Sequence, residues 1–146
     1  MNKTSQTQVP ALRISRLLPA TPEEVFGAWT DPDSVKLWMA PGALTVPIAE
    51  LDVRVGGRFR IVMRGEGGDY VHEGEYREVS PPHRLVFTWI SKGTHGKETV
   101  VTVELEARGE GTELTLTHEG LPDSEQRAQH EGGWSGILDK FASQME

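Results

Sequence analysis

One segment near the end of the sequence restricts the possible folds more than any other. Residues 124–145 carry apolar side chains at a period of about 3.6, which is typical of an amphipathic helix. At about 1.5 Å per residue this helix would be roughly 33 Å long, and no other segment predicts a helix of that length. Asp123 is its expected N-cap, with Gln126 as the reciprocal partner. A sheet in this protein therefore has only this helix to cover its whole length.

The sequence before this helix reads mainly as strands and turns. Alternation of apolar and polar residues predicts a strand at 11–18 and about six more between 44 and 119. Because these strands follow one another through short turns, we expect them to pair mainly antiparallel. The last two are predicted to form a hairpin that places on one face Val101, Val103, Leu105, Leu114, Leu116 and His118.

Two short helices are predicted between the first strand and the second. Thr21 and Glu24 form a capping box with Pro22 at the first helical position, and Asp31 followed by Pro32 repeats the device. The predicted order is strand, two short helices, six strands and one long helix. This is an α+β layout in which a curved antiparallel sheet of about seven strands wraps around the C-terminal helix.

Composition narrows the range of functions. The 146 residues fit one domain, predicted at 10–146 after a disordered polar tail at 1–9. The net charge is −7 and the basic residues do not cluster, so no nucleic-acid partner is expected. No apolar run suits a signal peptide or a membrane span, so we expect a cytoplasmic protein. The absence of cysteine excludes thiolate catalysis, disulfides and cysteine-ligated zinc.

Four stretches carry a family resemblance: PEEVFGAWTDPDSVKLWM (22–39), DVRVGGRFRIVM (52–63), GEYREVSPPHRLVFTW (74–89) and the region GTELTLTHEGL to Leu138 (111–138). In this order they resemble the START/Bet v-type helix-grip (SRPBCC) superfamily, and within it the group named after the activator of the heat-shock-protein-90 ATPase. The resemblance implies a sheet and a long helix that enclose a cavity for hydrophobic or aromatic small molecules. It does not imply one activity, because members of such a superfamily differ in function.

Within such a fold, strand and helix periodicity predicts which side chains contact a ligand. The predicted ligand-binding residues are Trp38, Phe59, Ile61, Met63, His72, Phe87, Trp89, Leu116, His118, Trp134 and Leu138. The alternative is that these side chains simply fill a core, as Met and aromatic residues at regular spacing often do. Four tryptophans favour the cavity slightly, because large rigid rings with a polar N–H suit a site that is apolar yet oriented.

His72 and His118 are the polar side chains that strand alternation turns inward. Each is expected to be either a structural histidine with satisfied hydrogen bonds or a ligand contact. Glu73 and Glu119 are their sequence neighbours, but successive residues of a strand point to opposite faces, so neither forms an acid/base pair with them. His118 and His130 lie on different elements, which disfavours a metal site. We therefore predict no catalytic residue, no metal and no cofactor.

Three glycines lie inside the predicted long helix: Gly132, Gly133 and Gly136. Each costs about 1 kcal/mol relative to alanine, so a compensating role is expected. Gly132 and Gly136 are four residues apart and would let another backbone approach one helix face. The alternative is that the helix opens locally to admit a ligand.

Together these features predict a non-enzymatic protein that binds a hydrophobic or aromatic small molecule between its sheet and its C-terminal helix. Two alternatives stay open. One is a co-chaperone-like module for protein interaction, and the other is a cyclase-like or hydrolase-like enzyme that uses His72 or His118 as acid or base. Ligand identity and oligomeric state do not follow from the sequence.

Overall fold

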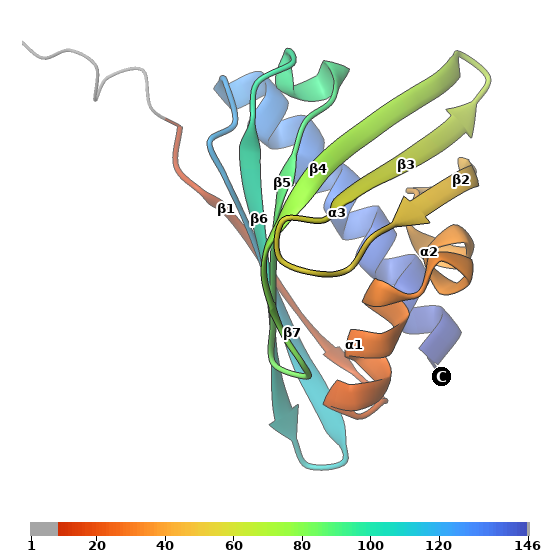
Figure 1. Cartoon of the computed structure of the whole chain (residues 1–146), viewed down its shortest axis with the longest axis vertical. Helices are drawn as coiled ribbons and strands as arrows, with labels where there is room; N and C mark the ends of the chain where they lie inside the picture. The colour runs from red at the N-terminus through yellow and green to blue at the C-terminus, as the bar shows by residue number, and fades with distance from the viewer. Residues whose placement is uncertain (1–8, 146) are drawn as a thin grey trace, which may run out of the picture.

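A computed structural model describes residues 9–145 (Figure 1). The predicted disordered tail lies outside these residues, except for Val9. The elements in chain order are β1 (Leu12–Leu18), α1 (Pro22–Thr30), α2 (Pro32–Trp38), β2 (Thr45–Leu51), β3 (Arg58–Gly65), β4 (Gly68–Ser80), β5 (Arg84–Trp89), the short 3-10 helix η2 (Lys92–Thr94), β6 (Thr99–Arg108), β7 (Gly111–Glu119) and α3 (Ser124–Met145).

The seven strands form one antiparallel sheet in the order β1-β7-β6-β5-β4-β3-β2. In Figure 1, α3 (blue) runs along one face of the curled sheet, from the end near η2 to the end near α1 and α2. The predicted helix-grip fold is therefore confirmed, including the two short helices after the first strand. None of the helices within residues 9–145 is long and apolar enough to cross a membrane.

The predicted β6–β7 hairpin has the expected register. Val101 lies opposite His118 and Val103 opposite Leu116, and each of the four side chains is at most 1% exposed. A slip by one residue would turn all four toward solvent, so their burial fixes the pairing. The hairpin thus forms part of the wall that faces α3.

The helix ends follow the predicted caps with one exception. Thr21 Oγ1 accepts a hydrogen bond from the Glu24 amide at 3.1 Å, Glu24 Oε1 accepts one from the Thr21 amide at 2.9 Å, and Asp31 caps α2. Asp123 Oδ1 accepts from the Gln126 amide at 2.8 Å, which starts α3. The reciprocal bond predicted for Gln126 is wrong, because its Oε1 is buried without a partner among the described residues.

Two arginines attach α3 to the edge strand β1. Arg16 Nε donates to Asp139 Oδ1 at 3.1 Å and an Arg16 terminal nitrogen donates to Ser135 Oγ at 2.8 Å. Near the other end of the helix, Arg127 Nε donates to the Pro10 carbonyl at 3.0 Å. These contacts explain why Arg16 lies on an otherwise apolar strand face, and they attach the first turn and the second half of α3 to β1 and the residues just before it.

The C-terminal half of α3 packs on a filled aromatic core. The ring centroid of Trp38 lies 4.4 Å from that of Phe141 and 4.7 Å from that of Trp29. Phe141 and Leu138 are completely buried, and Trp29 is 3% exposed. Burial of such side chains contributes roughly 1.5–3 kcal/mol each, so this end of the helix supplies much of the stability.

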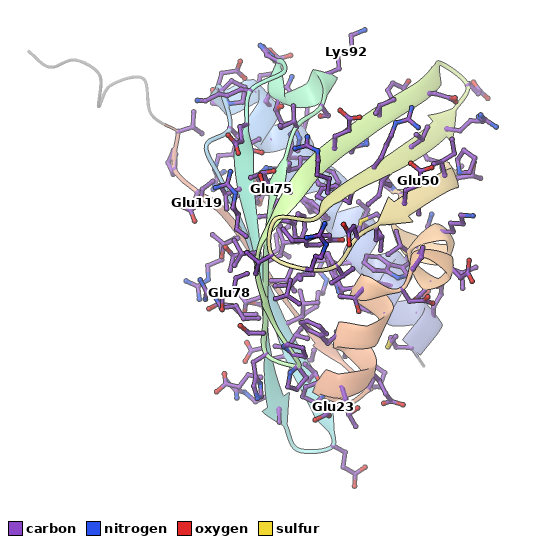
Figure 2. All side chains as sticks on the ribbon, viewed as in Figure 1. Glu23, Glu50, Glu75, Glu78, Lys92 and Glu119 are labelled. Carbon is purple, nitrogen blue, oxygen red and sulfur yellow. The ribbon has the colours of Figure 1, made fainter. Side chains whose placement is uncertain are left out.

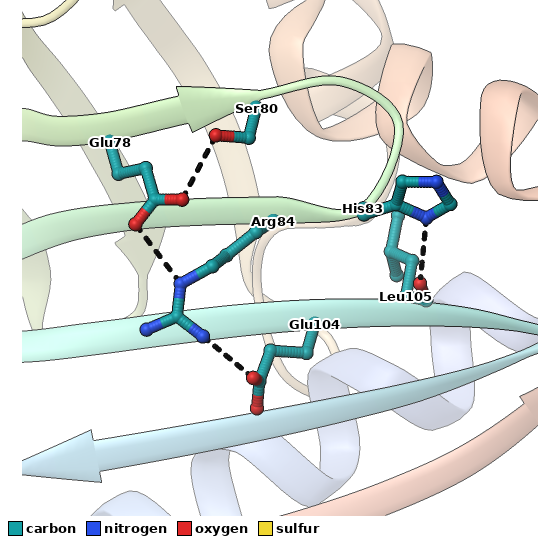
Figure 3. Close-up of polar contacts among 6 residues, drawn as sticks. All are labelled: Glu78, Ser80, His83, Arg84, Glu104 and Leu105. Atoms are coloured by element: carbon teal, nitrogen blue, oxygen red, sulfur yellow. Dashed lines mark hydrogen bonds and ion pairs between the residues drawn. The ribbon is translucent and has the colours of Figure 1, made fainter.

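The opposite face of the sheet is polar. On β4, β5 and β6, Arg84 donates to Glu78 at 3.0 Å and to Glu104 at 2.7 Å, while the Ser80 hydroxyl donates to Glu78 at 2.9 Å (Figure 3). All three charged side chains are more than two-fifths exposed, so solvent screens these ion pairs. This face is therefore a solvated surface rather than a second core.

Candidate functional site

A cavity of about 290 Å³ separates the sheet from the N-terminal half of α3. Its walls come from β3, β4, the end of β5 and α3, and the α2–β2 loop and η2 border it. The apolar part of the wall is formed mainly by Leu44, Met63, Trp89, Trp134 and Ile137. A volume near 300 Å³ is the lower end of the range for small-molecule sites.

Gly133 explains why this half of the interface is not filled. It lines the cavity, and a Cβ built on it would meet no atom within 4 Å. Gly132 is equally open but faces solvent, so the predicted close backbone approach at Gly132 is wrong. That approach exists only at Gly136, where an added Cβ would lie 3.3 Å from Pro41 Cβ in the α2–β2 loop. The glycines therefore serve different purposes: Gly136 lets the α2–β2 loop approach the helix closely, and Gly133 leaves space in the cavity.

His118 is completely buried in the core and both of its ring nitrogens are hydrogen-bonded. Trp134 Nε1 donates to His118 Nδ1 at 3.0 Å, so Nδ1 carries no proton. His118 Nε2 must then donate to Thr99 Oγ1 at 2.8 Å, and that hydroxyl donates to the Trp89 carbonyl at 2.5 Å. Burial lowers the pKa of His118 to about 3, so the ring is neutral at pH 7. His118 is a structural histidine that fixes Trp134 against β5 and β6.

His72 lies on the cavity wall and differs from His118 in its hydrogen bonding. Its ring stacks at 4.8 Å from that of Trp89, tilted by 34°. Its Nδ1 is buried and has no partner in the part of the chain that the structure describes. Burial lowers the pKa of His72 to about 4, which keeps the ring neutral at pH 7. His72 therefore contributes a neutral aromatic ring to the cavity wall, while its Nδ1 is shielded from the cavity as well as from solvent.

Two cavity-lining residues carry a further buried polar atom without a partner within residues 9–145. These atoms are the Trp89 indole Nε1 and the Gln126 side-chain oxygen Oε1, and neither has accessible surface in the cavity. His130 also lines the cavity, but its Nδ1 is bonded to the Gln126 carbonyl at 2.8 Å, one helical turn earlier. Burial lowers the pKa of His130. The wall is thus apolar with a few neutral polar groups.

No group of three or more His, Asp or Glu side chains that could hold a metal ion was found within residues 9–145. His118 and His130 lie close, with ring centroids 5.2 Å apart, but their hydrogen bonds go to Thr99, Trp134 and a backbone carbonyl rather than to a carboxylate. Glu119 is exposed, and Figure 2 shows it at the outside of the sheet. The arrangement offers shape and neutral hydrogen-bonding groups, and no carboxylate is bonded to a cavity imidazole among these residues.

The structure places the eleven predicted ligand-binding residues in three groups. The first group lines the cavity and comprises Met63, His72, Trp89 and Trp134. The second group lies deeper and, together with Trp89, borders a void of only about 10 Å³; it comprises Phe59, Ile61 and Phe87. The third group is buried in the core away from both spaces and comprises Trp38, Leu116, His118 and Leu138. The four side chains of the third group therefore fill the core, which was the alternative to ligand contact for inward-facing residues.

Other cavity-lining residues were not predicted as binding residues from the sequence. Gln126 and His130 read as polar residues of the first helical turns, and Leu44 lies in a loop. The signal that could have found this wall is Gly133, because a helix glycine one residue before a buried tryptophan leaves a gap on the same side. Strand alternation points to the whole inner face and does not show which part of it remains unfilled.

A separate hollow of about 430 Å³ lies on the outer face of the sheet. Its charged lining residues include Arg84, Glu104 and Glu113. They pair within the protein, since Glu113 lies 2.9 Å from Arg108 and Arg84 bonds Glu104. This hollow lacks the mainly apolar wall of the inner cavity, which is therefore the better candidate site.

Comparisons with known proteins agree with this architecture. Residues 19–146 match the family model described as activator of Hsp90 ATPase homolog 1-like protein. A crystal structure of a Chromobacterium violaceum protein is 27% identical, with a TM-score of 0.86 over 93% of this chain and 96% of that one. An AHSA1 protein from Silicibacter pomeroyi is 31% identical, with a TM-score of 0.81 over 92% and 96%. An AHSA1-like protein from Aeromonas hydrophila is 29% identical, with a TM-score of 0.73 over 90% of each chain.

A comparison with curated protein sequences gave no match. The family match covers most of the chain, and the Silicibacter pomeroyi protein exceeds 30% identity over nearly its whole length. The chain therefore belongs to the activator of Hsp90 ATPase homolog 1-like family, within the helix-grip superfamily.

Proposed function

We propose that this protein binds a hydrophobic or aromatic small molecule in the cavity between its sheet and α3, without catalysing a reaction. The observation that carries the proposal is the space of about 290 Å³ that Trp89 and Trp134 help to line and that the open Gly133 leaves unfilled. Side chains normally pack to fill such an interface, and an unfilled apolar space lowers stability. A small molecule that occupies the cavity best explains why this space is left unfilled.

The route into the cavity supports the same use. Tyr70 and Val71 at the outer end of β4 are 42% and 39% exposed and also line the cavity. Lys92 on η2 and Gln129 on α3 are exposed lining residues as well. The mouth of the site therefore lies between β4, η2 and α3, where a small molecule can enter without unfolding the aromatic core.

Binding is favoured over catalysis because of the histidines. A general acid or base needs a nitrogen that can exchange a proton with the substrate. His118 has both nitrogens bonded inside the protein, and its pKa of about 3 lies far from neutral pH. His72 reaches the cavity, but its pKa of about 4 makes it a weak base at pH 7.

The absence of cysteine favours a reducing compartment, so we expect this binding to occur in the cytoplasm.

Titration with small aromatic probes tests the proposal. Naphthalene and 2-naphthol should bind, and tryptophan emission should report it because Trp89 and Trp134 line the cavity. Native mass spectrometry of the purified protein should show whether a ligand copurifies. The substitution Gly133→Leu places a side chain in the space and should abolish probe binding.

The matched control is Gly132→Leu, one residue earlier in the same helix and facing solvent. It changes helix propensity in the same way and should leave binding unaltered. The proposal fails if neither probe binds to the wild-type protein, or if Gly133→Leu binds them as well as Gly132→Leu does.

A further inference from the structure

His130 on α3 lines the cavity, and one of its ring nitrogens has a proton that the helix backbone fixes. Nδ1 lies 2.8 Å from the Gln126 backbone carbonyl, one helical turn earlier. A carbonyl oxygen only accepts hydrogen bonds, so Nδ1 must carry the proton. Burial lowers the pKa of His130, which keeps the ring neutral at pH 7. The other ring nitrogen, Nε2, is therefore an unprotonated acceptor.

The Nε2 atom of His130 is accessible, in contrast to the enclosed polar atoms of this wall. It has no hydrogen-bond partner within residues 9–145, and it does not belong to the unpartnered side-chain atoms that are buried, such as Nδ1 of His72 and Nε1 of Trp89. An atom that is neither bonded nor buried keeps accessible surface. Because His130 is part of the cavity wall, a molecule in the cavity can reach this nitrogen.

The neighbours of the His130 ring hold it without using Nε2. The ring of His118 meets it edge to face, with centroids 5.2 Å apart, but the nitrogens of His118 bond to Thr99 and Trp134. From η2, a Cβ built on Gly93 would lie 3.2 Å from His130 Cε1, so η2 comes close to the ring because Gly93 has no side chain. The acceptor is thus held in place before a ligand binds, which lowers the cost of binding.

The rest of the cavity wall restricts the charge of a donor that could bond to His130. No Asp or Glu lines the cavity, so an ammonium group would lose its hydration without gaining a counter-ion. Lys92 at the mouth would also repel a cation. A neutral hydroxyl or N–H group therefore suits this wall better than a charged donor.

We propose that the cavity selects aromatic molecules that carry a neutral hydrogen-bond donor, such as a phenol hydroxyl, and that His130 Nε2 accepts this hydrogen bond. This inference rests on the proposed function and deepens it by naming the chemical class of the ligand. The donor lies beside α3 and η2, and the rings of the molecule contact the apolar side chains of Leu44, Met63 and Ile137.

Three probes of similar size test the requirement for a donor. Naphthalene has no polar group, 2-methoxynaphthalene has an acceptor only, and 2-naphthol is neutral at pH 7 and has a hydroxyl that can donate. Isothermal titration calorimetry at pH 7 should show that 2-naphthol binds roughly 2- to 10-fold more tightly than 2-methoxynaphthalene, because only the hydroxyl can donate to His130.

A variant and a matched control assign this preference to one side chain. His130→Phe keeps an aromatic ring on the wall without the acceptor, and should reduce the preference for 2-naphthol over 2-methoxynaphthalene to about one. His83→Phe makes the same change on the outer face of the sheet, where His83 Nδ1 lies 3.4 Å from the Leu105 carbonyl. It should leave the preference unchanged.

Nitrogen-15 NMR of the wild-type protein, labelled at histidine, tests the same hydrogen bond without a substitution. The Nε2 signal of His130 should have the frequency of an unprotonated imidazole nitrogen. Addition of 2-naphthol should shift this signal toward the protonated range, and 2-methoxynaphthalene should leave it nearly unchanged. A histidine that only packs against the ligand would respond equally to both probes.

The outcomes separate this inference from the proposed function. If 2-methoxynaphthalene binds as tightly as 2-naphthol, if the preference persists in His130→Phe, or if Nε2 carries the proton, the donor requirement is wrong while binding in the cavity stands. If none of the three probes binds the wild-type protein, the proposed function and this inference fail together.

Discussion

The two halves of the interface between α3 and the sheet differ, although the same helix forms both. The C-terminal half packs Phe141 against Trp38 with ring centroids 4.4 Å apart and leaves little space. The N-terminal half faces β3 and β4 across a cavity of about 290 Å³, with Gly133 at its wall. A single helix can thus pack tightly against the sheet at one end and leave a cavity at the other.

The two inward histidines show the same division. His118 bonds Trp134 and Thr99 and joins the core, whereas His72 lines the cavity and its buried Nδ1 has no partner among the described residues. Both are neutral because burial lowers their pKa, to about 3 for His118 and about 4 for His72. Burial and neutrality are therefore common to both histidines, and their position and hydrogen-bond partners are what distinguish them.

The largest difference between the two halves is expected from truncation of large side chains. Phe141→Ala should lower the free energy of unfolding by about 3–5 kcal/mol, because it opens a new cavity in the filled half. Met63→Ala should cost only about 2 kcal/mol, since Met63 already borders open space. Urea denaturation followed by circular dichroism measures both values. Equal costs would show that the cavity half is as tightly packed as the core.

Removal of each histidine should sharpen the comparison. His118→Leu leaves the Trp134 indole N–H without its acceptor and removes the donor to the Thr99 hydroxyl, and should cost about 2–3 kcal/mol of unfolding free energy. His72→Leu removes a nitrogen that has no partner, and should change stability by less than about 1 kcal/mol. Chemical denaturation of the two variants side by side checks this. A costlier His72→Leu would contradict the assignment of roles.

Acidification should weaken the fold through these same rings. An unfolded histidine binds a proton near its ordinary pKa of 6.5, while buried His118 and His72 do not bind one until pH about 3 and about 4. Below pH 6.5 the unfolded state therefore gains protons that the folded state lacks, and stability falls with pH. Each ring should contribute a loss of about 1.4 kcal/mol between pH 7.5 and pH 5.5.

Urea unfolding at pH 7.5, 6.5 and 5.5 measures this loss. These values lie above the range where exposed carboxylates mainly titrate, so the histidines dominate the change. His130, whose pKa burial also lowers, acts in the same direction. His72→Leu should show a smaller loss than the wild-type protein. An identical pH dependence in the variant would mean that His72 is accessible to protons in the folded state.

The fold could be predicted from the sequence because its signals are local. The capping box at Thr21, the alternation on β6 and β7, and the helical period around Trp134 each act within a few residues. Together with the order of elements they leave few topologies for a sheet and one long helix.

The site could be predicted only in part, because empty space is a property of the assembled structure. Alternation correctly turns both Phe87 and Trp89 inward, yet Phe87 fills the interior and only Trp89 reaches the cavity. Gln126 reads as a capping residue, yet its Oε1 makes no capping bond and the residue lines the cavity. Whether an inward-facing side chain is covered by its neighbours or borders the cavity depends on residues that are distant in the sequence, such as those of the α2–β2 loop.

The smallest effect, and the one that tests the cavity most directly, concerns the two adjacent helix glycines. Gly133→Ala and Gly132→Ala should each raise the free energy of unfolding by about 0.5–1 kcal/mol, because alanine has the higher helix propensity and neither added Cβ meets an atom within 4 Å. Their effects on ligand binding should differ. The methyl group at position 133 enters the cavity and should weaken 2-naphthol binding, whereas the one at position 132 faces solvent and should not. Thermal denaturation and probe titration of both variants measure the two effects. Equal gains in stability with unequal losses of affinity would show that glycine is kept at position 133 for the space it leaves, at the expense of helix stability.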